Sequence, residues 1–184
     1  MDEYLPDGWE WKRLRNVLIC LESGRRPKGG ARDQEGVPSI GGEHLDKSGN
    51  FLLEKVKFIP TKFYESMRRG KISKGDVLIV KDGATTGKVA LVRDDFPFDE
   101  AAVNEHVFIC RPNHEHVSSK YLFYHIFSPV GQTQIKKSFH GSAQGGINTE
   151  FADTYKFPVP PLETQHRITS ILEKAEETKR LRSQ

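Results

Sequence analysis

The stretch GDVLIVKDGATTGKVALV, residues 75–92, decides how the middle of this chain folds. It holds two apolar runs, at 77–80 and 89–92, separated by a loop of glycine, threonine and charged residues. Four consecutive apolar residues bounded by turn formers are typical of a buried strand. Gly83 and Gly87 permit the bend between the runs. The pattern predicts a strand–loop–strand hairpin.

The loop of this hairpin invites comparison with a nucleotide-binding P-loop, and it fails that comparison. A P-loop has four residues between its glycines, a hydroxyl residue after its lysine, and a helix after that. Here three residues separate Gly83 from Gly87, Val89 follows Lys88, and the chain continues as a strand. We therefore expect no nucleotide site. The loop is either purely structural or presents Thr85, Thr86 and Lys88 to the phosphate backbone of a nucleic acid.

Short strand and helix patterns follow one another along most of the chain and predict an α+β fold. Short apolar-polar stretches at 9–14 and 17–21 come first, and strands are predicted at 37–40, 56–59 and 102–110. Thr61 is expected to cap a helix at 61–69, and Ser118 or Ser119 one that runs to Phe127 before Pro129 stops it. A further helix is expected at 131–139. The predicted architecture is a globular domain with a twisted sheet and short helices.

The C-terminal segment differs in kind from the rest. After FPVPP at 157–161, residues 162–184 contain neither glycine nor proline. Their apolar side chains recur at the i, i+3, i+4 and i+7 spacing of one helix face, which consists of Ile168, Ile171, Leu172 and Ala175. A helix of this length measures about 35 Å. The stripe predicts packing against a partner helix; packing on the chain's own domain is the alternative.

Composition and charge limit the class of protein. The chain has 184 residues, 36% of them hydrophobic, and a net charge of +3, which suits one ordinary folded domain. The start MDEYLPDGW is too acidic and polar for a signal peptide, and no apolar run reaches the length of a membrane helix. Cys20 and Cys110 lie in apolar segments and are expected to be unpaired core residues in a reducing compartment. These features predict a cytoplasmic protein.

Positive charge is concentrated in glycine-rich loops. These are SGRRPKGGAR at 23–32, MRRGKISKGD at 67–76 and KKSFHGSAQGG at 136–146. A flexible backbone combined with positive charge suits contact with phosphate groups, whereas scattered surface lysines would serve only solubility.

The sequence shows no catalytic constellation. The glycine-rich turn and the Asn/Asp-Pro-Pro-aromatic motif of methyltransferases that bind S-adenosylmethionine do not occur. Cys110, His114 and His116 could suggest a zinc site, but no second cysteine lies near them in the sequence. The segment is therefore better explained as a turn than as a zinc site. No metal or cofactor is expected.

Five segments in order, together with Gly145-Gly-Ile-Asn148, resemble the specificity subunits of type I restriction–modification enzymes. They are LPDGWE at 5–10, VPSIGG at 37–42, GDVLIVKDGATTGK at 75–88, AVNEHV at 102–107, and FPVPPLETQ at 157–165. The Pro-Pro-Leu-x-x-Gln start of the long helix is the most specific of them. Thr164 stands where the family often has glutamate, which weakens one contact at the helix start.

The resemblance implies a division of the chain and a set of partners. Residues 1–158 would be a target recognition domain that reads half of a bipartite site in double-stranded DNA. Residues 159–184 would begin the conserved helix that acts as spacer and dimerisation element. Methyltransferase and restriction subunits, and a second half-subunit, would be its protein partners. Those enzyme subunits would bind S-adenosylmethionine and ATP, and this chain would be non-catalytic.

Side-chain chemistry nominates the residues that contact DNA. Arginine and lysine suit guanine or phosphate, and glutamine and asparagine suit adenine. The candidates are Arg25, Arg26, Lys28, Arg32, His44, Lys81, Thr85, Thr86, Lys88, Gln144 and Asn148. Two alternatives remain open: a recognition fragment of a fused restriction–methylation enzyme, and an adaptor whose basic loops bind an acidic protein.

Overall fold

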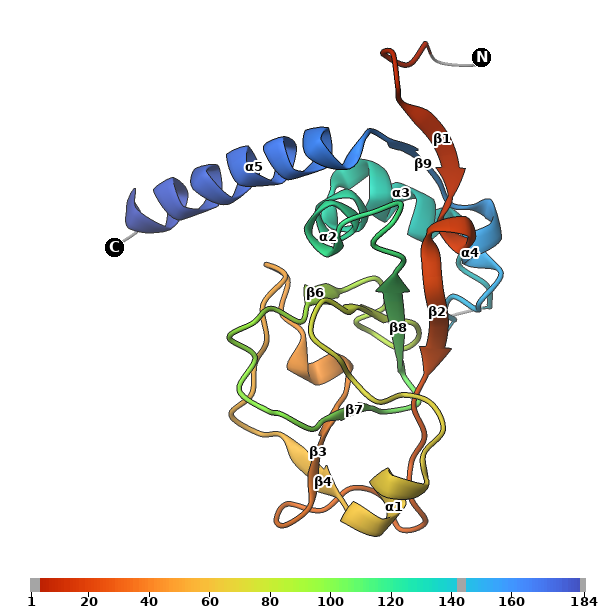
Figure 1. The fold of residues 1–184 in the computed structure, drawn as a ribbon. Coiled ribbons are helices and arrows are strands. Elements are labelled where there is room, and N and C mark those ends of the chain that lie inside the picture. The colour runs from red at the N-terminus through yellow and green to blue at the C-terminus, as the bar shows by residue number, and fades with distance from the viewer. Residues whose placement is uncertain (1–3, 142–144, 183–184) are drawn as a thin grey trace.

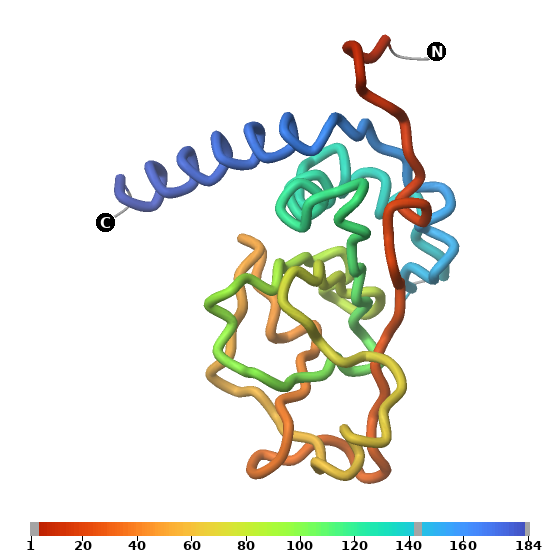
Figure 2. The backbone as a smooth tube through the Cα atoms, viewed as in Figure 1, coloured from red at the N-terminus to blue at the C-terminus, as the bar shows by residue number. Residues whose placement is uncertain are grey.

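The computed structural model describes residues 4–141 and 145–182. The strands are β1 Glu10–Arg13, β2 Leu18–Ser23, β3 Val37–Ile40, β4 Lys57–Ile59, β5 Val77–Val80, β6 Val89–Leu91, β7 Ala102–Val103, β8 Val107–Pro112 and β9 Lys156–Val159. The helices are α1 Thr61–Ser66, α2 Ser119–Phe127, α3 Pro129–Lys137, α4 Phe151–Thr154 and α5 Leu162–Arg182, with 3-10 turns η1 Leu14–Val17 and η2 Gly42–His44. Helices α2 and α3 lie above strands β6 and β8, α1 lies at the bottom, and the C-terminal helix leaves the body sideways (Figures 1 and 2).

The described strands form three small sheets, where the sequence predicted a single twisted one. The four-stranded sheet has the order β2-β8-β5-β6, the three-stranded sheet β4-β3-β7, and the two-stranded sheet β1-β9. The mixed α+β class is confirmed.

The predicted hairpin is confirmed, and its strand β5 separates two hydrophobic cores. β5 pairs antiparallel with β6 and with β8. Val77 and Ile79 pack in the core under α2, while Leu78 and Val80 pack in the core on the opposite face. Successive side chains of a strand point to opposite faces. The unbroken apolar run VLIV is therefore explained by burial on both sides.

Two predicted elements begin differently in the structure. Ser118 does cap α2, since its hydroxyl oxygen accepts a hydrogen bond from the backbone N–H of Tyr121. Pro129 does not merely stop that helix: it occupies the first turn of α3, where a missing N–H costs nothing. Thr61 does not cap α1, because it is already the first helical residue and Pro60 takes the cap position without a side-chain bond.

The predicted strand at 102–110 was wrong in one respect, because it is two strands in different sheets. β7 pairs with β3, and β8 pairs with β2 and β5. Between them, Asn104, Glu105 and His106 form a turn in which the backbone N–H of His106 donates to Asn104 Oδ1 at 2.9 Å. The three polar residues of the turn interrupt the apolar run, and the structure shows that this interruption marks the boundary between the two strands.

The C-terminal helix α5 is attached at its start and exposed further along. Gln165 and Thr169 are buried, and Ile168 packs against the core under α2. Ile171 is 61% exposed and Leu172 37% exposed, and Ala175 is exposed too. Part of the predicted stripe thus packs on the chain's own domain, and the rest lies at the surface.

Candidate nucleic-acid interface

Four loops that are distant in sequence lie side by side. The backbone N–H of Gly24 donates to Asn104 O at 3.1 Å, that of Lys81 to His106 O at 2.9 Å, and that of Ile147 to Lys81 O at 2.7 Å. We call residues 24–27, 81–88, 104–106 and 145–148 the loop face. Backbone hydrogen bonds fix these loops relative to one another, so their side chains form one surface.

A continuous series of ionisable side chains, which we call the charge chain, crosses the loop face. Arg26 Nε lies 2.8 Å from Glu105 Oε1, and His106 Nε2 lies 3.4 Å from the same oxygen. The other ring nitrogen of His106 contacts Asp82, whose second oxygen lies 3.0 Å from Lys81 Nζ. Burial acts to raise the pKa of Asp82, but hydrogen bonds from Lys81 and His106 outweigh it and lower that pKa below its usual value. Asp82 is therefore held as a carboxylate.

A polar hollow of about 310 Å³ opens beside this chain of charges. Its lining supplies both hydrogen-bond donors and acceptors, from Arg26, Ser39, Glu43, Lys57, Asn104 and Glu105 among others. Glu105 Oε2 is buried and has no hydrogen-bond partner among the described residues. An unpaired buried carboxylate oxygen is costly unless a donor reaches it.

The central hairpin loop is fastened by its own polar side chains. Lys88 Nζ donates to Leu45 O at 2.7 Å, and Thr86 Oγ1 donates to Gly83 O at 2.7 Å. Thr85 is half-buried in the same loop. One of the donors of the Lys88 ammonium is therefore used inside the protein, and the others remain for a ligand.

His44 and Asn148 are engaged in local structure. His44 is 3% exposed; its Nδ1 accepts from the backbone N–H of Gly41, and its Nε2 lies 3.3 Å from Lys55 O. Its ring nitrogens are thus already partnered inside the fold. Asn148 is exposed, and its Oδ1 accepts from the backbone N–H of Glu150 in the turn before α4.

The remaining basic candidates are exposed. Arg25 lies beside the end of α1, next to Arg68 and Arg69. Lys28 is on the loop after β2, and Arg32 is held by backbone bonds to Phe58 while its side chain is exposed. Gln144 lies outside the described residues.

A protein-family comparison matches almost the whole chain. Residues 6–184 match the model described as "Type I restriction modification DNA specificity domain". This chain belongs to that family.

Individual specificity subunits support the assignment. The specificity domain is 27% identical over 172 residues to the putative type I restriction enzyme MjaX specificity subunit of Methanocaldococcus jannaschii, covering 91% of this chain and 39% of that protein. It is 24% identical over 181 residues to the EcoBI specificity subunit of Escherichia coli, covering 94% of this chain and 36% of that one. The chain therefore spans less than half the length of these relatives.

Solved structures share the fold of this specificity domain. The HsdS subunit from Thermoanaerobacter tengcongensis matches with a TM-score of 0.69 and 24% identity, over 99% of this chain and 47% of that one. A chain from a study of complex assembly and conformational transition of the type I R-M system matches with a TM-score of 0.73 and 19% identity, over 96% and 40%. As a specificity domain the chain is non-catalytic, as predicted.

Sequence reasoning missed three members of the charge chain in this specificity domain. Asp82, Glu105 and His106 were not among the nominated residues, although AVNEHV was recognised as a family segment. Candidates were chosen mainly for positive charge, so carboxylates were left out. The role of a carboxylate can be assigned only when its neighbours in the fold are known. Within the described residues no helix is long and apolar enough to cross a membrane, and no cluster of His, Cys, Asp and Glu could hold a metal ion.

Proposed function

We propose that this specificity domain reads one half of a bipartite DNA sequence for a type I restriction–modification enzyme. The observation that carries the proposal is the loop face, where loops from four parts of the chain bring cations, carboxylates and an amide together. Phosphate contacts by the basic loops would supply most of the affinity, which would make binding strongly dependent on salt. Recognition of a particular base sequence also needs the carboxylates and the amide of the loop face.

The carboxylates of the loop face support base reading rather than phosphate binding. Phosphates repel carboxylates, so Glu105 and Asp82 would weaken a surface that only tracked the backbone. A carboxylate accepts a hydrogen bond from the exocyclic amino group of cytosine, and an arginine donates to guanine. Glu105 holds Arg26 at 2.8 Å, so both kinds of group are positioned in advance.

Helix α5 is the proposed connection to protein partners. Ile171, Leu172 and Ala175 lie on its surface beyond the point where the helix packs on α2. We infer that this stripe packs against the matching helix of a second half-subunit. The methyltransferase subunits would dock on the same assembly and, with the restriction subunit, supply the S-adenosylmethionine, the ATP and the chemistry in the cytoplasm.

Selection from random duplexes tests the proposal. The chain, alone and together with its methyltransferase subunits, would be mixed with duplexes of random sequence, and the bound fraction sequenced after several rounds. We expect one half-site motif to be enriched and binding to weaken steeply with added salt. Failure to bind any duplex in either form would favour the alternative of an adaptor that binds an acidic protein.

A further inference from the structure

We propose that Arg25, Arg68 and Arg69 form a binding site for one phosphate group of the DNA backbone. This site rests on the proposed function and deepens it, because it separates a phosphate contact from the base-reading contacts beside it.

The three arginines surround one hollow. The hollow measures about 320 Å³ and is lined by these residues and Ser66, from the loop after β2 and the end of α1. Its lining contains no carboxylate, and within residues 4–141 and 145–182 none of the three guanidinium groups lies in an ion pair with an acid. Arg26, the next residue along from Arg25, is instead paired with Glu105. Adjacent arginines therefore have different environments.

Two glycines bring the arginine-bearing segments together. A Cβ on Gly70 would lie 2.5 Å from Gly24 Cα, so the two backbones touch without intervening side chains. A Cβ on Gly24 would lie 1.5 Å from Val103 O. Gly70 also has a φ of +82°, which favours glycine. Arg25 follows Gly24 and Arg69 precedes Gly70, so this close approach sets their guanidinium groups around one space.

Electrostatics favours an anion in that space. The nearby carboxylate of Glu22 accepts from the backbone N–H of Gly70 at 2.8 Å and does not line the hollow. Three neighbouring positive charges repel one another, and a bound anion relieves the repulsion. The planar guanidinium group matches the oxygen geometry of phosphate with paired hydrogen bonds. A phosphate fits this chemistry.

The position of the hollow favours a phosphate of bound DNA over free phosphate. Arg25 and Arg26 are consecutive, and Arg26 belongs to the charge chain of the loop face. The Arg25 side chain lines the hollow that contains no carboxylate, whereas the Arg26 side chain is paired with Glu105. A duplex lying on the loop face would place bases against the mixed charges and its backbone beside the arginines.

The test replaces DNA phosphates one at a time with neutral methylphosphonates. The duplex is the one enriched by selection, and binding is measured for the wild-type chain and for Arg68→Gln and Arg69→Gln. We expect each variant to bind about tenfold more weakly and its dependence of log affinity on log salt to be shallower by about 1. One neutral phosphate should weaken the wild type but cost the variants nothing further.

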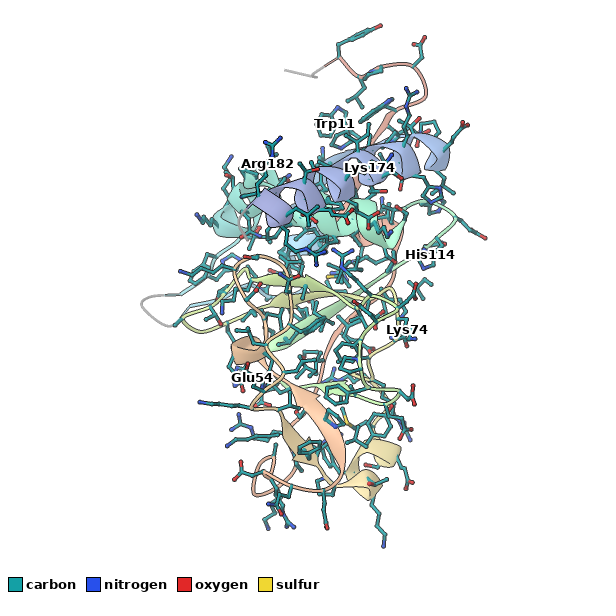
Figure 3. All side chains as sticks on the ribbon, turned by 90° about the vertical axis from the view of Figure 1, so that its left-hand side faces the viewer. Trp11, Glu54, Lys74, His114, Lys174 and Arg182 are labelled. Atoms are coloured by element: carbon teal, nitrogen blue, oxygen red, sulfur yellow. The ribbon has the colours of Figure 1, made fainter. Side chains whose placement is uncertain are left out.

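Lys74→Gln is the matched control. It removes one positive charge from the same basic loop, but Lys74 lies on the flank of the molecule near His114 (Figure 3), well above α1 at the bottom of Figure 1. It should show full sensitivity at the same phosphate. Circular dichroism confirms that each variant is folded.

Three outcomes would overturn the proposal. In the first, the chain binds the duplex, but every methylphosphonate weakens wild type and variants equally. This result contradicts the arginine site and leaves the proposed function standing. Competition by inorganic phosphate at the hollow, without any coupling to a DNA phosphate, assigns the site to a free anion. Absence of duplex binding by the wild type contradicts both this site and the proposed function.

Discussion

The side chain of Gln165 accepts a hydrogen bond from the backbone N–H of Ser118 at 2.8 Å and so joins the start of α5 to the start of α2. Its Nε2 donates to His116 O at 2.9 Å and to Pro160 O at 2.8 Å. The residue is fully buried. One amide thus serves three backbone groups and fixes where α5 leaves the body, which gives the Pro-Pro-Leu-x-x-Gln motif a physical reason.

Replacing this glutamine should therefore be costly. Gln165→Leu leaves one N–H and two carbonyl groups without a partner, and we expect a loss of about 2 to 4 kcal/mol in the free energy of unfolding. Urea denaturation followed by circular dichroism measures it. The exposed neighbour His166 is the control, since His166→Ala should stay within about 0.5 kcal/mol. Equal effects of the two changes would contradict the role assigned to Gln165.

The ion pair of the partly exposed Arg111 with the buried Asp76 should matter far more than an exposed pair. Arg111 Nε lies 2.8 Å from an Asp76 carboxylate that is 1% exposed. Arg111→Met should destabilise the fold by about 3 to 5 kcal/mol, because it leaves a buried charge unpaired. Arg15→Met breaks the exposed pair with Asp153 and should cost far less, because solvent screens an exposed pair. Thermal and urea unfolding compare the two; a similar loss in both would refute the distinction.

His125 should make stability fall in mild acid. Burial lowers the pKa of His125 from 6.5 to about 4, and its Nδ1 lies 2.8 Å from Tyr155 Oη. The folded state disfavours the charged ring, so the unfolded chain binds the proton more readily. Stability is then full above pH 6.5 and is lost as the pH falls toward 4, by about 2 to 3 kcal/mol.

Urea midpoints measured between pH 7 and pH 4 check this dependence. The variant His125→Gln lacks the titrating group and should lose most of the slope in that window, even though it is less stable at pH 7. An unchanged slope in the variant would assign the pH dependence to other groups.

The exposed and buried parts of the α5 stripe should separate pairing from stability. Changing both Ile171 and Leu172 to serine should abolish self-association seen by analytical ultracentrifugation while leaving the unfolding free energy nearly unchanged. Ile168→Ser is the counterpart: it removes a side chain packed on the core under α2 and should destabilise by about 2 kcal/mol or more. If the wild-type chain stays monomeric at all concentrations, the proposed pairing through the exposed part of the α5 stripe is wrong.

Glu105 should influence which bases are preferred more than how tightly DNA is held. Glu105→Gln keeps the size of the side chain but removes its charge and frees Arg26. We expect relaxed preference at one or two base pairs of the selected half-site, with overall affinity unchanged or slightly higher because a repulsive charge is gone. Selection and sequencing with the variant gives the answer. A uniform loss of affinity with an unchanged motif would contradict base reading by this residue.

Local pattern determined much of this protein. The hairpin at 75–92, the capped helix after Ser118, the long C-terminal helix and the family segments are all encoded in contiguous residues. Apolar periodicity, capping and breaking residues act over a few positions, so the sequence alone reveals them. The family resemblance is spread over such local segments, and the comparison over residues 6–184 confirms it.

Tertiary structure alone decided which of the polar candidates are available. Lys88 bonds Leu45 and Arg26 pairs with Glu105, in both cases through a partner that its own sequence neighbourhood does not specify. His44 is buried by the packing of the fold. Gly24 and Gly70 bring two basic segments together although the sequence separates them widely. Local propensity carries no information about such contacts, because they form only when remote segments pack and exclude water between them.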